Sequence, residues 1–263
     1  MKARTGSFYG VGVGPGDPEL MTLKAVRVLE GARVIAAPSS TEEPGGPALL
    51  ALDVVRRVLK DLRGKEVLRL HLPMTRDREL LLASREKAAS IIAERLRTGM
   101  DVCFITLGDP MLYSTFGYLV PLVRGALPGV IVKAVPGVSS ISAAASISCS
   151  PLAESDERVM IIPAAYDIPG VKRLLEDFDT VVLMKVNRKM DAVIELLEET
   201  GLADRAMFVS RAGLPEEEVV TDIKSLRGRK VDYFSMVIVR KGGRGENPTG
   251  ENPAKGNGEK VRS

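Results

Sequence analysis

The sequence predicts an α/β protein with two α/β domains, the first built on a mostly parallel sheet and the second on a mixed sheet. Short apolar runs of strand length alternate with longer amphipathic segments, which is the pattern of this class. Up to Val135 the connections are long enough for helices, and such crossovers join parallel strands. After Val135 several connections are too short, which indicates antiparallel pairs. A length of 263 residues allows one large domain or two small ones, and the change of rhythm favours two.

The first domain, residues 1–135, is predicted to hold five strands with helices between them. Pro18 opens the first helix, since proline is favoured at a helix start, and Gly31 closes it. Further helices are expected at Pro47–Leu62, at Asp77–Thr98 and in a segment that ends at Leu127. The five apolar runs read as strands are Phe8–Val13, Val34–Ala37, Val67–Leu72, Val102–Leu107 and Val130–Val135.

The second domain, residues 136–240, is predicted to begin with a helix of small residues at Ile141–Ile147. Its expected strands are Val159–Ile162, Thr180–Met184, Ala206–Ser210, Glu218–Thr221 and Phe234–Val239. Residues 241–263 are mostly Gly, Asn, Pro, Glu and Lys, which cannot bury a core, so a disordered tail is expected there.

Composition excludes several classes of function. One histidine, His71, and two cysteines cannot assemble a zinc site, so no metal site is expected. Aromatic residues make up 4% and Trp is absent, which disfavours a base-stacking surface for nucleic acid. No apolar run approaches the roughly 18 residues that span a bilayer, so we expect a cytoplasmic protein without a membrane segment. The net charge of +3 comes from dispersed residues and permits an anionic substrate.

Three polar loops follow predicted strands, where ligands of open α/β sheets gather. The first, Gly10–Pro18, has four glycines but lacks the G-x-G-x-x-G spacing and the G-K-[ST] ending of nucleotide-binding loops. The second begins Gly108-Asp109-Pro110, and the third is Val135–Ser140. Each also has a purely structural interpretation, because Asp17, Asp109 and the serines are all good helix caps.

Taken together, the loops resemble a known family. The segments are Gly12-Val-Gly14-Pro15-Gly16-Asp17-Pro18-Glu19-Leu20, then Gly108-Asp109-Pro110 followed by Tyr113-Ser114-Thr115, then Val135-Pro136-Gly137-Val138-Ser139-Ser140. In this order they resemble the class III tetrapyrrole (precorrin/cobalt-factor) methyltransferases of cobalamin biosynthesis. Leu183-Met184-Lys185 and Tyr233-Phe234-Ser235 are most similar to the branch that methylates C-20 of precorrin-2 or cobalt-factor II. The resemblance covers about residues 6–240.

The resemblance implies two-domain homodimers that bind S-adenosylmethionine in a cleft between the domains and act on a tetrapyrrole. The positions that match the family's cofactor-binding residues are Pro15, Leu107, Gly108, Asp109, Leu112, Ser114, Thr115, Ser139, Ser140, Met184, Ala212, Gly213, Ser235 and Met236.

A catalytic base does not follow from the resemblance. Related uroporphyrinogen enzymes have proposed acid/base residues after the second strand, and Pro38–Pro47 has no matching motif here. Tyr113 and Asp109 are the catalytic candidates, for orienting the substrate or accepting a proton. Arg76, Arg78 and Arg188 are candidates for binding substrate carboxylates, although solvated surface arginines would look the same.

Other functions stay open at this point. A sibling enzyme could methylate another tetrapyrrole carbon, or a protein as diphthine synthase does. A cofactor-binding module that has lost turnover would also keep the glycine loops.

Overall fold

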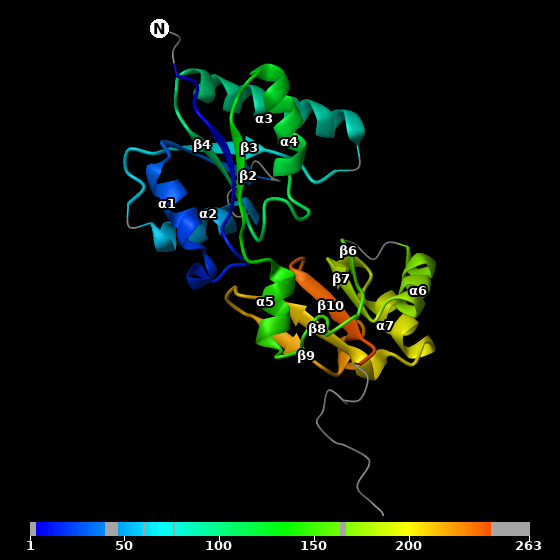
Figure 1. Cartoon of the computed structure of the whole chain (residues 1–263). Coiled ribbons are helices and arrows are strands. Elements are labelled where there is room, and N and C mark those ends of the chain that lie inside the picture. Colours follow the sequence, from blue (N-terminus) through cyan, green and yellow to red (C-terminus); the bar gives the residue numbers. More distant parts are fainter. Residues whose placement is uncertain (1–3, 40–46, 60, 76, 164–166, 243–263) are drawn as a thin grey trace, which may run out of the picture. The chain divides into compact units, whose positions relative to one another are not determined.

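The computed structural model describes residues 4–39, 47–59, 61–75, 77–163 and 167–242. The chain divides into two compact units, Met1–Ala143 with Gly213–Pro215, and Ala144–Ala212 with Glu216–Ser263. Each unit is built on its own five-stranded sheet, with helices interleaved (Figure 1). The first sheet is entirely parallel and the second is mixed, so the predicted fold class is confirmed.

The first sheet has the strand order β3-β2-β4-β1-β5. Its strands are β1 (Phe8–Gly12), β2 (Val34–Ser39), β3 (Glu66–His71), β4 (Val102–Thr106) and β5 (Val132–Val135). The helices α1 (Leu23–Gly31) and α2 (Pro47–Val58) cover one face, and α3 (Arg78–Arg97) and α4 (Phe116–Ala126) cover the other (Figure 1).

Strand β2 shows why the inner strands of this sheet are mostly apolar, unlike its two edge strands. Val34 and Ala36 pack with α3 and α4, whereas Ile35 and Ala37 pack with α1 and α2. All four side chains are buried, because a strand with helices on both faces has no solvent side.

The first helix begins later than the sequence suggests. Pro18–Leu20 forms only one 3₁₀ turn, with the Asp17 side chain accepting from the backbone N–H of Glu19. A second cap then intervenes, since the Thr22 hydroxyl accepts from the N–H of Ala25 at 3.1 Å and α1 starts at Leu23. Two capping residues in six positions split one predicted helix into a turn and a helix.

The second sheet has the order β6-β7-β10-β8-β9. Only β6 and β7 pair in parallel, and the other pairs are antiparallel. The strands are β6 (Val159–Ile162), β7 (Thr180–Met184), β8 (Ala206–Ser210), β9 (Glu218–Val220) and β10 (Ser235–Arg240). The helix α5 (Ser140–Ile147) contains the boundary between the two units.

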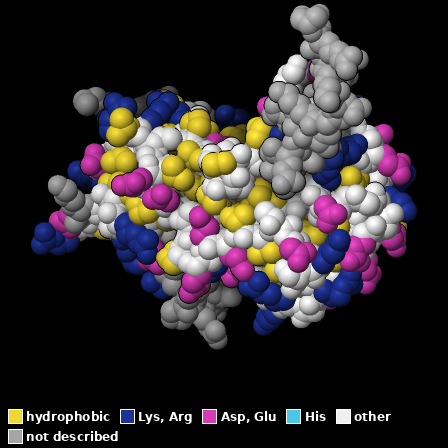
Figure 2. Space-filling view, turned by 90° about the horizontal axis from the view of Figure 1, so that it is seen from below, with side chains coloured by type: hydrophobic (Ala, Val, Ile, Leu, Met, Phe, Trp, Pro, Cys, Tyr) yellow, Lys and Arg dark blue, Asp and Glu magenta, His cyan; other side chains and the backbone are white. Residues whose placement is uncertain are grey.

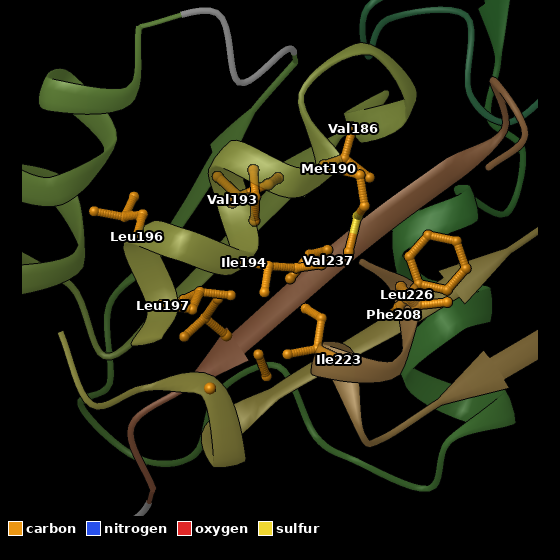
Figure 3. Packing of buried hydrophobic residues seen from close by; sticks show 14 of the residues in the cluster. Val186, Met190, Val193, Ile194, Leu196, Leu197, Phe208, Ile223, Leu226 and Val237 are labelled. Carbon is orange, nitrogen blue, oxygen red and sulfur yellow. The ribbon is translucent and has the colours of Figure 1, made fainter. Parts of the chain in front are cut away.

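The core of the second unit lies between its sheet and the helices α6 (Ile168–Asp177) and α7 (Met190–Glu199). Alternate residues of the strands enter it, among them Phe208 of β8 and Val237 of β10. Figure 3 shows Ile194 of α7 beside Val237. This packing holds the strand ends that carry the candidate site.

The surface carries charges of both signs. On the face in Figure 2, Lys and Arg side chains are interspersed with Asp and Glu, and hydrophobic side chains lie among them. Within the described ranges, no helix combines the length and the apolarity needed to cross a membrane.

Candidate functional site

The three polar loops follow β1, β4 and β5, and they meet at the end of the first sheet where these strands finish. Strands β4, β1 and β5 are neighbours and run parallel, so the loops after them leave from the same edge. Gly12, Gly108 and Gly137 bring these loops into backbone contact. A Cβ on Gly12 would lie 2.5 Å from the Gly108 carbonyl oxygen, and a Cβ on Gly137 would overlap the same oxygen. Only glycine permits this approach.

Two hydrogen bonds fasten the loops together. The N–H of Gly108 donates to the Gly14 carbonyl at 2.7 Å. The Asp109 carboxylate accepts from the N–H of Gly137 with one oxygen, at 3.0 Å, and from the N–H of Met111 with the other, at 2.8 Å. Asp109 therefore binds the backbone of two loops rather than capping a helix, and both its oxygens are engaged.

The remainder of the second loop presents a tyrosine. Tyr113 is half exposed and has a left-handed backbone, with φ at 52°. The Ser114 hydroxyl donates to the Thr106 hydroxyl and accepts from the N–H of Phe116, which holds the start of α4. Thr115 precedes α4, and its side chain makes no capping hydrogen bond. Of the two leucines of this loop, Leu107 is half-buried and Leu112 is partly exposed. A left-handed non-glycine residue costs free energy, and such residues concentrate at functional sites.

The serines of the third loop have different roles. The Ser139 hydroxyl accepts from the N–H of Ser142 at 3.1 Å and caps α5, as its structural interpretation predicted. Ser140 is the first residue of α5 and is half-buried. Gly108 lies beside both, because a Cβ there would be 3.9 Å from Ser139 Cα and 4.0 Å from Ser140 N.

Pro15 lies against a segment far away in the sequence. A Cβ on Gly213 would be 3.2 Å from Pro15 Cγ and 3.2 Å from Asp17 N. Leu214, which is buried, occupies the space that a side chain on Gly16 would need. The structure thus brings Pro15 and Gly213 together within the first unit. Leu214 is a residue that the sequence analysis missed, and the Gly-Leu-Pro sequence was its only signal.

The remaining candidates lie at one end of the three inner strands of the second sheet, β7, β10 and β8. Met184 ends β7 and pairs with Met236 near the start of β10, which is antiparallel to it. Ser235 pairs with Ser210 at the end of β8, and Ala212 follows two residues later. Ser235 and Ala212 are buried and Met184 is half-buried. The candidates of the three loops, together with Gly213, lie in the first unit, and Met184, Ala212, Ser235 and Met236 lie in the second.

The arginine candidates are less constrained. Arg78, the first residue of α3, and Arg188 are exposed, and Arg76 lies outside the described residues. Among the described residues, no three His, Cys, Asp or Glu side chains are grouped to hold a metal ion. Both groups of candidates consist mainly of backbone amides, hydroxyls and apolar side chains, which suit a ligand of mixed polar and apolar surface.

Comparison with known proteins bears on this arrangement. A family model described as "Tetrapyrrole (Corrin/Porphyrin) Methylases" matches residues 7–227. The cobalt-precorrin-2 C(20)-methyltransferase of Salmonella typhimurium is 33% identical over 237 residues, 90% of this chain and 97% of the relative. A probable cobalt-precorrin-2 C(20)-methyltransferase of Methanocaldococcus jannaschii is 34% identical over 239 residues, 89% and 95% of the two chains. The solved uroporphyrin-III C-methyltransferase of Thermus thermophilus, complexed with S-adenosyl homocysteine, has a TM-score of 0.62 at 25% identity and covers 90% of this chain and 98% of that one.

Proposed function

The chain belongs to the tetrapyrrole (corrin/porphyrin) methylase family, and on this premise we propose that it transfers a methyl group from S-adenosylmethionine to C-20 of precorrin-2 or its cobalt-containing counterpart. The observation that carries the proposal is the identity of 33% and 34% to two relatives named for this reaction, over about nine-tenths of the chain. The reaction is a step of cobalamin biosynthesis.

The residues present fit S-adenosylmethionine. Gly108 supplies a cradle, because its left-handed backbone, with φ at 69°, leaves the space beside Ser139 and Ser140 free of a side chain. Backbone groups of Leu107–Asp109 and the start of α5 would hold the polar end of the cofactor. Met184, Ala212, Ser235 and Met236 would contact its adenosine. When bound, the cofactor supplies a sulfonium methyl group that is already activated for transfer.

The protein's task is then alignment. Three loops joined through Gly12, Gly108 and Gly137 already hold one another in place, so they need not be ordered each time the reacting atoms are aligned. Tyr113, half exposed in its strained turn, is proposed to orient the tetrapyrrole and to relay to solvent the proton that the methylated ring carbon releases. Arg78 and Arg188 are proposed to bind substrate carboxylates.

Asp109 is proposed to position the loops. Both its oxygens already accept backbone N–H bonds, and a proton accepted there would weaken the join between the second and third loops. The geometry therefore favours Tyr113 over Asp109 for contact with the substrate.

The test is single-turnover methylation by the full chain. The protein would be incubated with S-adenosylmethionine labelled in its methyl group and with precorrin-2 or cobalt-factor II, and the product examined by mass spectrometry and NMR. We expect a mass gain of one methyl group, with the label at C-20. Label at another ring carbon would indicate a sibling enzyme, and tight cofactor binding without methylation would indicate a binding module.

The two relatives that are 33% and 34% identical also favour one form of the substrate. Both are named for cobalt-precorrin-2, so we expect faster turnover of the cobalt-containing substrate than of the metal-free one. The family resemblance further supports a homodimer that acts in the cytoplasm. Light scattering after gel filtration would measure the mass of the assembly, and a monomeric mass would contradict the dimer.

A further inference from the structure

A hydrogen-bond network is centred on Asp232, just before β10. One carboxylate oxygen of Asp232 accepts from the N–H of Phe234 at 2.7 Å. The Asp232 carbonyl accepts from the Ser235 hydroxyl at 2.6 Å. These two bonds fix the turn from Asp232 to Ser235, so the direction in which β10 begins depends on Asp232.

The carbonyls of this turn hold the ends of both neighbouring strands. The N–H of Arg211, after β8, donates to the Phe234 carbonyl at 2.8 Å, and the N–H of Lys185, after β7, donates to the Ser235 carbonyl at 2.7 Å. Arg211 and Lys185 are both left-handed, with φ at 54° and 55°. A non-glycine residue keeps this conformation only where its surroundings hold it.

The Arg211 side chain closes the network. Its Nη1 lies 3.2 Å from the second carboxylate oxygen of Asp232, and the Arg211 side chain is only 22% exposed. Its Nε lies 3.4 Å from Glu216, which is 81% exposed. The pair with Asp232 is the more enclosed of the two, and charge-assisted bonds of this kind are the stronger ones. Solvent weakens the pair with Glu216.

We propose that Arg211 and Asp232 are positioning residues for the adenosine half of the cofactor site. This inference rests on the proposed function. Met184 directly precedes Lys185, Ala212 directly follows Arg211, and Ser235 belongs to the turn itself. The pair acts through these three residues, because it fixes the backbone from which they project. The pair is assigned no contact with the substrate or with the transferred methyl group.

The experiment compares four variants of the full chain. Asp232→Asn keeps the acceptor for Phe234 and removes the charge that faces Arg211. Arg211→Gln removes the same pair from the other side, and the double variant completes a double-mutant cycle. Glu216→Gln is the matched control, since it removes the exposed partner of the same guanidinium. Calorimetry would give the dissociation constant for S-adenosylhomocysteine, and kinetics would give KM for each substrate.

We expect each single variant at the pair to weaken S-adenosylhomocysteine binding about tenfold, as loss of a charge-assisted bond implies. The double variant should bind S-adenosylhomocysteine no more weakly than the weaker-binding of the two single variants does. KM for the tetrapyrrole should stay within about twofold, and so should every constant of Glu216→Gln. If the pair had a purely structural role, the variants would lower the thermal midpoint of unfolding. They would not raise KM for S-adenosylmethionine more than KM for the tetrapyrrole.

Two outcomes would overturn the inference. If the Asp232→Asn and Arg211→Gln proteins fold and bind S-adenosylhomocysteine as tightly as the wild type does, the positioning role of the pair is refuted. The proposed function would then still stand. A wild-type chain with no affinity for this ligand would remove the proposed function as well. If Asp232→Asn does not fold, Arg211→Lys, which keeps the charge but not the planar fork, should still raise KM for S-adenosylmethionine selectively.

Discussion

Asp109 and Gly137, 28 positions apart, are joined by a hydrogen bond of 3.0 Å from the glycine N–H to the carboxylate. The bond ties the loop after β4 to the loop after β5, across the end of the strand β1 that lies between them. Asp109 of the second loop thus fixes the backbone of the third loop.

Asp109→Asn should lower the free energy of unfolding by about 1–3 kcal/mol. Asparagine has one acceptor oxygen in place of two and carries no charge, so it cannot accept from both Met111 N–H and Gly137 N–H as the carboxylate does. Urea denaturation would measure the loss. Asp17→Asn is the control, since Asp17 accepts from a single N–H and asparagine caps equally well. Equal stability of the two variants would contradict the role given to Asp109.

Gly137→Ala should destabilise the first unit by about 1–3 kcal/mol or more, since its Cβ would overlap the Gly108 carbonyl oxygen. Gly125→Ala in α4 meets nothing within 4 Å and should raise stability by about 0.5–1 kcal/mol through helix propensity. The opposite signs can be read from thermal midpoints. A Gly137→Ala protein as stable as the wild type would refute the close approach.

The pair of Glu66 and Arg95 should make stability depend on pH. Hydrogen bonding to Arg95, at 2.8 Å, holds the pKa of the Glu66 carboxyl below its usual range. A lowered folded-state pKa gives stability that is present above the unfolded value, about 4.3, and is lost as the pH falls through the folded value.

Glu66→Gln should therefore flatten the acid limb of unfolding free energy against pH below about 4.3, where the wild-type pair loses its charge. Denaturant titrations at a series of pH values would measure this. Glu94→Gln is the control, because Glu94 is 60% exposed and lies 3.5 Å from the same arginine. Parallel acid limbs for wild type and Glu66→Gln would count against the pair.

The two thiols should react very differently. Burial, reinforced by the negative charge of Asp101, raises the pKa of Cys103 to about 12, whereas Cys149 is exposed. At pH 8 the native protein should lose one thiol to iodoacetamide and both in guanidinium chloride, since only the thiolate is nucleophilic. Peptide mass spectrometry identifies the residue. Labelling of Cys103 in the native state would show that β4 opens readily.

Much of the fold follows from local patterns. Every predicted strand is found within a few residues, because a run such as Val102–Leu107 is buried on both faces whatever its neighbours are. The first helix was placed too early, since Thr22 competes with Pro18 as a helix start and the sequence does not rank them. The antiparallel pairs of the second sheet were predicted from short connections and are confirmed.

The site is harder to predict because its contacts join distant positions. The approach of Gly12 to Gly137 depends on β1 and β5 being neighbours, and no local pattern specifies that order. Arg211 and Asp232 are 21 positions apart, and the pairing of β8 with β10 brings them together. The roles of Tyr113 and of the cofactor residues remain predictions.

The membership of Gly213–Pro215 in the first unit limits how this protein can be recombined. A graft that replaces everything after Ala143 by the same segment of another family member would also replace Gly213–Pro215 and so place a foreign segment against Pro15–Asp17. A fragment ending at Ala143 would lack Leu214, so Gly16 would face solvent where it now meets a leucine. The two units are therefore not interchangeable modules, and changes in the first loop must remain compatible with three residues encoded about 200 positions downstream.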